Sequence, residues 1–131
     1  MQAAQSVFTA PWPKTITPLD TCGLVRLQGE LFAEVCACGD LLTAAVIENY
    51  RIWLTAQGQN DSPTGSSILF DTVAVHLAHS RQYLRMEELG IRVTDDGFIV
   101  EDADAPQVEC AVAWEDYAGY QRSLVHTLTG G

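Results

Sequence analysis

The stretch I-L-F-D-T-V-A-V-H-L-A, residues 68–78, is apolar nearly throughout, and one carboxylate, that of Asp71, interrupts it. An ionised carboxylate among such side chains is costly to bury unless a cation or several hydrogen-bond donors accompany it. Two compatible interpretations follow: Asp71 caps the start of a helix by accepting bonds from the amides after it, or it binds a metal ion. Asp71 is therefore the most informative residue of the sequence.

Helix-like and strand-like segments surround this stretch. Apolar residues recur at helical spacings in the segments 3–8, 31–56 and 117–128. Strand patterns occupy the segments 15–21, 90–94, 97–100 and 108–114. The Asp95-Asp96-Gly97 sequence is a hairpin signal between two of these strands, and Asp40 is placed to cap the second of two helices. The mixture predicts an α/β fold.

Composition limits the classes of function. The 131 residues are 47% hydrophobic and 18% charged, which allows one domain with a sizeable core. The formal charge of −10 comes without any basic run, so binding to nucleic acid or to an anionic membrane is disfavoured. No stretch approaches the roughly 18 to 20 apolar residues that span a bilayer, and no targeting segment opens the chain. We therefore expect a soluble, cytoplasmic protein without nucleic-acid or membrane partners.

The cysteines and histidines give weak signals. The cysteines form no C-x-x-C pair and are expected to be buried free thiols: Cys22, Cys36, Cys38 and Cys110. His76 and His79 are three apart on the predicted helix and could share a metal ion, but no Glu or Cys stands at a matching offset. Ordinary helix histidines are the expected interpretation.

Three further residues are candidates for a binding site. Asp20 ends the predicted strand at 15–21, which is a common site position in α/β sheets and also a common turn position. Tyr50 and Trp53 lie in the last turns of a helix that leads into the polar loop 58–67. They either stack on an aromatic ligand or pack in the core. The loop either covers a binding site or is a plain surface connection.

The ordered set of these motifs resembles the inosine-uridine preferring nucleoside hydrolase family. The resemblance starts with T-P-L-D-T at 17–21 and the helix and polar loop that follow, and it continues with L-F-D-T-V-A-V at 69–75. An R-x-Y-L-x-x-E-E-L stretch from Arg81, the two short strands and the closing helix extend it. Similarity in order and spacing runs from about Ala3 onward.

The resemblance implies a fold. It indicates the C-terminal part of a mainly parallel open sheet flanked by helices. A domain of this family has about 300 residues, within the range that α/β folds reach. Residues 1–131 are accordingly expected to be the C-terminal portion of a single nucleoside-hydrolase-like domain whose N-terminal half is missing.

The resemblance also implies a reaction. In the family, aspartates of an N-terminal D-x-D-x-x-x-D-D motif hold a calcium ion that binds ribose and activates the water that cleaves the N-glycosidic bond. Asp71 matches a further calcium ligand, and calcium prefers such hard carboxylate oxygens. Phe70 stands where many members have a His that protonates a purine leaving group.

This sequence departs from the family in lacking the D-x-D-x-x-x-D-D motif. We therefore expect an incomplete and inactive fragment of an N-ribosyl hydrolase, which binds calcium and a ribonucleoside only when the missing half is present. The expected protein partner is that N-terminal half or a second copy of the chain. The alternative is a non-catalytic interaction module that keeps a remnant of the fold. The sequence does not determine which nucleoside is cleaved.

Overall fold

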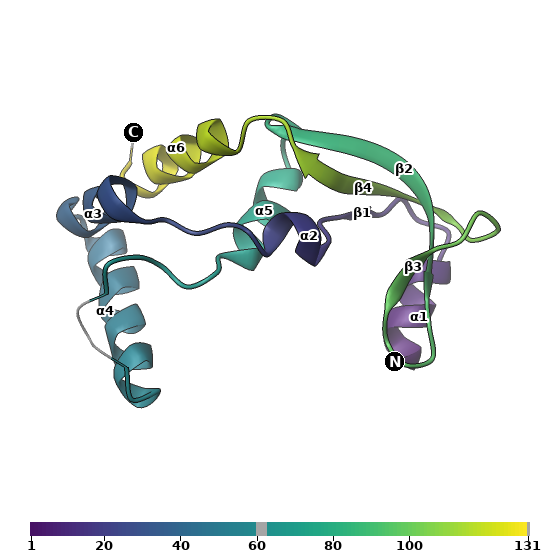
Figure 1. Cartoon of the computed structure of the whole chain (residues 1–131), viewed down its shortest axis with the longest axis horizontal. Helices are drawn as coiled ribbons and strands as arrows, with labels where there is room; N and C mark the ends of the chain where they lie inside the picture. Colours follow the sequence, from purple (N-terminus) through teal and green to yellow (C-terminus); the bar gives the residue numbers. More distant parts are fainter. Residues whose placement is uncertain (60–62, 131) are drawn as a thin grey trace. The chain divides into compact units, whose positions relative to one another are not determined.

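Two units divide the chain, and each is built from segments that are distant in sequence. The computed structural model describes residues 1–59 and 63–130 (Figure 1). Unit 1 consists of Met1–Gly23 and Phe70–Glu115, and unit 2 of Leu24–Leu69 and Asp116–Gly131. Whether both units belong to one larger domain stays a prediction.

Unit 1 contains the sheet. Its helices are α1 (Gln2–Thr9), α2 (Leu19–Cys22) and α5 (Phe70–Leu77), and its strands are β1 (Thr15–Ile16), β2 (Leu84–Val93), β3 (Ile99–Glu101) and β4 (Gln107–Trp114). The strand order is β1-β4-β2-β3. Strand β1 pairs with β4 in parallel, whereas β2 pairs with β3 and with β4 in antiparallel fashion. The α/β class is confirmed.

The expectation of a mainly parallel sheet is wrong. Short turns connect β2, β3 and β4, because residues 94–98 and 102–106 are the only residues between them. A parallel connection needs a crossover of a dozen or more residues, so β2 and β3 can only pair antiparallel. The short link between β3 and β4 keeps β4 in the direction of β3, and β4 is therefore also antiparallel to β2. The predicted hairpin is confirmed: Thr94 N–H donates to the Phe98 carbonyl over 2.8 Å, and Gly97 has the positive φ of 94° that the turn requires.

The strand predicted at 15–21 is shorter than expected. Only Thr15–Ile16 pair with β4, and α2 starts at Leu19. Pro18 causes the change because it lacks an N–H for a ladder, while its carbonyl accepts bonds from the amides of Thr21 and Cys22. The chain therefore turns into a helix directly after the strand.

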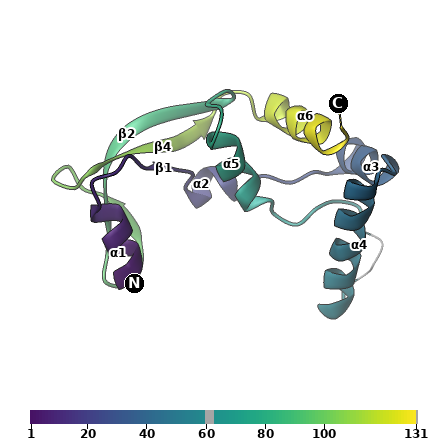
Figure 2. The same ribbon diagram turned by 180° about the vertical axis from the view of Figure 1, so that it is seen from behind.

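Two packing contacts hold the helices of unit 1 on its sheet. The buried core consists of Ile91, Val108 and Cys110, with Phe8, Ile16, Leu89 and Val112 against it. The Thr21 hydroxyl is buried and donates to the Ala111 carbonyl over 3.0 Å, which anchors α2 on β4. Helices α2 and α5 contact each other and lie side by side in both ribbon views (Figure 1, Figure 2).

Unit 2 is helical. It contains α3 (Gly29–Ala37), α4 (Leu41–Ala56) and α6 (Tyr117–Leu128). Its buried core consists of Leu27, Phe32, Val35, Ile47 and Val125. The predicted cap is confirmed, since Asp40 Oδ1 accepts the amides of Leu42 and Thr43 over 2.7 and 2.9 Å. The Cys38 thiol, followed by Thr43, lowers the pKa of Asp40 to about 2.

The cysteine prediction is right in part. All four thiols are free, and Cys22 and Cys110 are buried, but Cys38 is half-buried and Cys36 is exposed. Cys36 faces outward because Phe32 and Val35 occupy the inner face of α3. Three residues of the polar loop predicted at 58–67, residues 60–62, lie outside the described residues.

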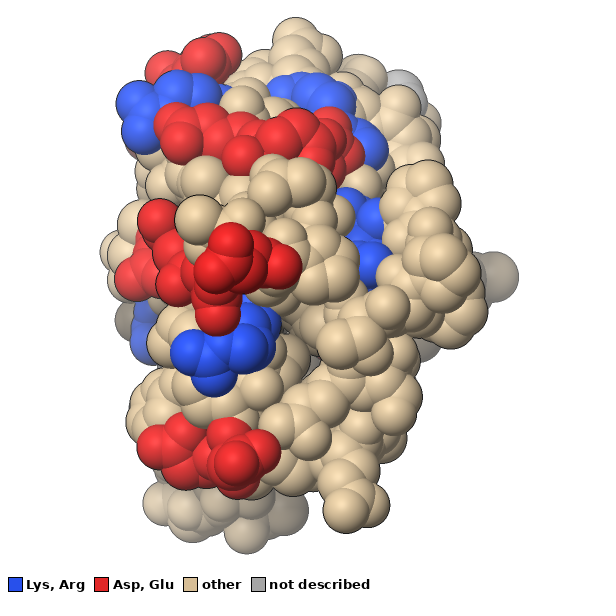
Figure 3. All heavy atoms as spheres, turned by 90° about the vertical axis from the view of Figure 1, so that its right-hand side faces the viewer, with Lys and Arg blue, Asp and Glu red and all other residues tan. Residues whose placement is uncertain are grey.

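Charged side chains are mixed on the surface that Figure 3 shows. Carboxylates gather there in several groups, and Lys and Arg side chains lie beside and between them (Figure 3). Separately, no helix in the described part of the chain has the length and apolar character needed to cross a bilayer.

Candidate functional site

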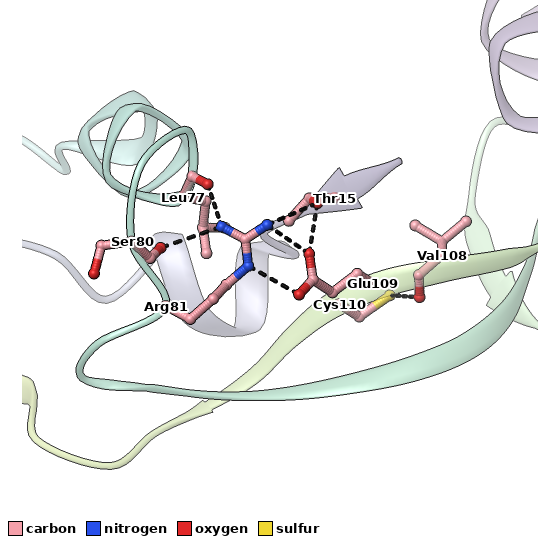
Figure 4. Close-up of polar contacts among 7 residues, drawn as sticks. All are labelled: Thr15, Leu77, Ser80, Arg81, Val108, Glu109 and Cys110. Atoms are coloured by element: carbon pink, nitrogen blue, oxygen red, sulfur yellow. Dashed lines mark hydrogen bonds and ion pairs between the residues drawn. The ribbon is translucent and has the colours of Figure 1, made fainter. Parts of the chain in front are cut away.

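A bidentate ion pair joins three elements of unit 1. Arg81 donates from Nε to Glu109 Oε1 over 2.9 Å and from Nη2 to Oε2 over 2.7 Å (Figure 4). The Thr15 hydroxyl donates to Glu109 Oε2 over 2.6 Å, and Arg81 Nη1 donates to the carbonyl of Leu77 at the end of α5. The guanidinium therefore ties the end of α5 to the adjacent strands β1 and β4.

The electrostatics of this contact follow from its geometry. The bond from Arg81, followed by the bond from Thr15, lowers the pKa of Glu109 to about 2. The same contact raises the pKa of Arg81. Both side chains are partly accessible, at 42% for Arg81 and 27% for Glu109, so water screens the pair. The pair links the end of α5, the helix that carries Asp71, to β1 and β4.

Asp71 lies in the first turn of α5, and its side chain is exposed. It is not the N-cap, because the helix begins at Phe70 and the cap position falls on the residue before that. The cost of burial does not arise, since Val73 and Leu77 take the buried face of the helix. A carboxylate in a first turn is favoured by the helix dipole and is here accessible to a ligand.

Phe70, which the resemblance aligns with an acid of the nucleoside hydrolases, is a packing residue. Its ring lies beside Gly23, where an added Cβ would stand 3.7 Å from Phe70 Cε1. The phenyl group has no proton to donate, and 41% of the residue is exposed. The described structure therefore offers no acid at this position of α5.

A hollow of about 670 Å³ lies against the sheet of unit 1. Its lining is mainly apolar and comes from β1, α2 and the strands β2 to β4, with Leu89, Ile91 and Val112 among the residues. Asp20 and Glu101 are the charged residues of the lining. Asp20 lies in α2 and not at the end of a strand as expected, and it lines this hollow, whereas Asp71 is not part of the same lining.

His76 and His79 lie close together near the end of α5. Their ring centroids are 5.4 Å apart, and the ring of Tyr83 lies 5.8 Å from that of His76. The prediction that both share a helix is wrong for His79, because α5 ends at Leu77. Among the described residues, no group of three or more His, Cys, Asp or Glu is arranged to hold a metal ion.

Tyr50 and Trp53 form a stacked pair in unit 2. Their centroids are 5.8 Å apart with an interplanar angle of 15°. Tyr50 is half-buried and meets the Phe32 ring edge-on, so it packs in the core as one of the two interpretations expected. In contrast, 46% of Trp53 is exposed. The outer surface of Trp53 is therefore the part of the pair that a planar ligand could reach.

No protein-family model matches the chain, and no curated protein matches it. The resemblance to nucleoside hydrolases stays a prediction.

Sequence reasoning missed the contact of Arg81 with Glu109 and the hollow on the sheet. The two residues are 28 positions apart, and their pairing depends on how β2 and β4 align. A pattern of neighbouring residues in the sequence does not predict an ion pair between such distant positions. The β-branched and apolar alternation at 108–114 did locate the strand that carries Glu109, but not its partner.

Proposed function

We propose that this chain contributes Asp71 as one calcium ligand to an N-ribosyl hydrolase site of the nucleoside-hydrolase type, in the cytoplasm. The observation that carries the proposal is the accessible carboxylate of Asp71 in the first turn of α5. A carboxylate oxygen is the donor that calcium prefers. The position of α5 is fixed by the Arg81 contacts at its far end, which supports a defined place for this ligand.

The proposal requires oxygen donors from outside this chain. A calcium site uses roughly six to eight oxygens, and one carboxylate supplies two at most. The other donors belong to a segment carrying the D-x-D-x-x-x-D-D motif. The chain alone is therefore proposed to be inactive, and a complementary segment would complete the site.

Residues of this chain would have different roles in the proposed reaction. Asp71 would donate oxygen to the calcium ion, which when bound would hold the ribose hydroxyls and lower the pKa of a water. Phe70 has no proton for the leaving base, so a purine would have to leave without help from this position.

Calcium binding tests the role of Asp71 directly. We would titrate calcium by calorimetry into the chain alone, and into the chain mixed with a segment that carries the aspartate motif. The proposal expects binding in the mixture and none tighter than about micromolar with the chain alone. Asp71→Asn should weaken binding by the mixture, whereas Asp20→Asn is the matched control and should not. Equal affinity for the Asp71→Asn mixture would contradict the proposal.

The second candidate is a non-catalytic interaction module. The hollow of about 670 Å³ and the exposed apolar residues near it, Leu19 at 73% and Phe98 at 68%, favour it. The calcium titration separates the two candidates, because a module gains no calcium affinity when the aspartate segment is added.

A further inference from the structure

Helix α4 is apolar on two opposite faces. Its inner face carries the buried residues Thr43, Ile47 and Leu54. At 100° per residue, the opposite face carries the following residues, which we name the α4 stripe: Leu41, Leu42, Ala45, Val46, Asn49, Ile52, Trp53 and Ala56. No charged residue belongs to the stripe, since Glu48 and Arg51 lie beside it.

The large apolar side chains of the α4 stripe are exposed. The exposed fractions are 92% for Leu41, 64% for Leu42, 45% for Val46, 58% for Ile52 and 46% for Trp53. At roughly 200 Å² for a large side chain, they present about 600 Å² of apolar surface. Monomers rarely expose contiguous apolar patches of more than a few hundred Å². A helix that is apolar on both faces is typical of one that is covered on both.

This area is close to what one partner supplies in a stable dimer. A standard interface buries roughly 800 Å² on each partner, of which the central part is apolar and the rim polar. The α4 stripe is the right size for the central part. Its rim would include polar residues that flank it, among them Glu48 and Thr55.

The order of residues in the α4 stripe fits a second copy of the same helix running antiparallel. Leu42, Ala45, Asn49, Ile52 and Ala56 follow the alternating spacing of three and four that is found in coiled coils. With a twofold axis at Asn49, large residues meet small ones or residues of similar size. The resulting pairs are Leu42 with Ala56, Ala45 with Trp53, and Val46 with Ile52.

Charge and polarity also favour a second copy. The chain has a net charge of −10, which opposes association except through a surface without carboxylates, and the α4 stripe is such a surface. A basic partner would find no acid on the stripe to bind. Asn49 is the one polar residue of the stripe and would meet its own copy at the axis, where a single Asn sets the register of a helix pair.

We infer that two copies of this chain associate through the α4 stripe, with their α4 helices antiparallel about a twofold axis at Asn49. The contact is isologous, so it closes at the dimer and does not propagate. It leaves the sheet of unit 1 and Asp71 outside the interface residues, and it does not depend on the proposed reaction.

Complementary charges test both the association and its direction. We would measure sedimentation equilibrium for the natural chain and for the variants Val46→Lys and Ile52→Glu, each alone and mixed in equal amounts. The natural chain should be dimeric at about 100 µM, and each variant alone should dissociate at least about tenfold more readily. The mixture should form a one-to-one heterodimer, because the lysine introduced in one copy would face the glutamate introduced in the other, while the natural Val46 and Ile52 still meet.

Controls keep the result interpretable. Ala44→Lys adds the same charge on an exposed position of α4 outside the stripe and should remain dimeric. Circular dichroism of each variant reports folding, and recovery of the dimer in the mixture shows that both variants are folded. A natural chain that is monomeric at this concentration would overturn the inference. Single variants that dimerise as well as the natural chain would also overturn it. The antiparallel direction would be wrong if a mixture of Val46→Lys with Val46→Glu forms a dimer while the mixture of Val46→Lys with Ile52→Glu does not.

Discussion

The guanidinium of Arg81 donates hydrogen bonds to both carboxylate oxygens of Glu109, over 2.9 Å and 2.7 Å, although the two residues are 28 positions apart in the sequence. Through Thr15 and the carbonyl of Leu77, the same pair connects β1, β4 and α5. The helix that carries the proposed ligand, Asp71, is therefore bonded at its opposite end to the sheet of unit 1.

This contact makes the stability of the protein depend on pH in the acid range. The pKa of Glu109 is lowered from 4.5 to about 2, so its contribution is fully present above pH 4.5 and is lost as the pH falls through 2. Glu109→Gln should lower the free energy of unfolding at pH 7 by about 1 kcal/mol, since the pair is partly exposed. Urea unfolding of both proteins between pH 7 and pH 2 measures the difference, which should shrink toward the acid end.

The control for this prediction is Glu34→Gln, which alters an exposed carboxylate of α3 that takes no part in this contact. The free energy of unfolding of this variant should differ little from that of the natural protein, and the difference should not shrink as the pH falls. A constant difference for Glu109→Gln across the pH range would show that the ion pair has no stabilising role.

Gly90 should not tolerate a side chain. A Cβ at this position would lie 2.2 Å from the carbonyl oxygen of Asp102, which is backbone and cannot move without breaking its turn. The Asp102 amide also donates to the Gly90 carbonyl over 2.9 Å, so both segments are fixed there. Gly90→Ala should destabilise the protein by about 2 kcal/mol or more in urea unfolding. A decrease of only a few tenths of a kcal/mol in the free energy of unfolding would contradict this close approach.

The four thiols should differ widely in reactivity toward a thiol reagent. Cys36 is exposed and should react first, whereas Cys22 and Cys110 are buried. Burial, followed by the nearby carboxylate of Glu88, raises the pKa of Cys110 and makes its thiolate scarce. Cys36→Ser should remove the fast phase of labelling and leave the slow phases intact. Four equally fast thiols in the folded protein would be the contrary result.

Asp40 should stabilise α4 through its cap rather than through its charge. Asp40→Ala removes the acceptor of the amides of Leu42 and Thr43 and should lower the Tm by a few degrees. Asp40→Asn keeps an acceptor and should lose much less. Differential scanning calorimetry of the two variants decides between cap and charge, because a charge effect would make them equally unstable.

Local signals in the sequence predicted local structure well. The Asp95-Asp96-Gly97 turn, the cap at Asp40 and the closing helix after Trp114 are all present, because each depends on residues only a few positions apart. The strand predicted at 15–21 ends at Ile16 instead, because Pro18, a local signal in the same segment, cannot continue the strand ladder.

Features that depend on distant residues were not predicted. The family resemblance implies a mainly parallel sheet, whereas the short connection between β2 and β3 is the physical signal for antiparallel pairing. The exposure of Asp71 and of the α4 stripe could not be inferred from periodicity alone, because an apolar helix face does not reveal what covers it.

The release of free ribose tests the central claim most directly. We would incubate mixed purine and pyrimidine nucleosides and calcium with the chain alone, with the aspartate-motif segment alone, and with both together. The account predicts ribose only from the mixture, and a loss of about 100-fold or more when the chain carries Asp71→Asn. Ribose release by the chain alone, or undiminished release by the Asp71→Asn mixture, would contradict it.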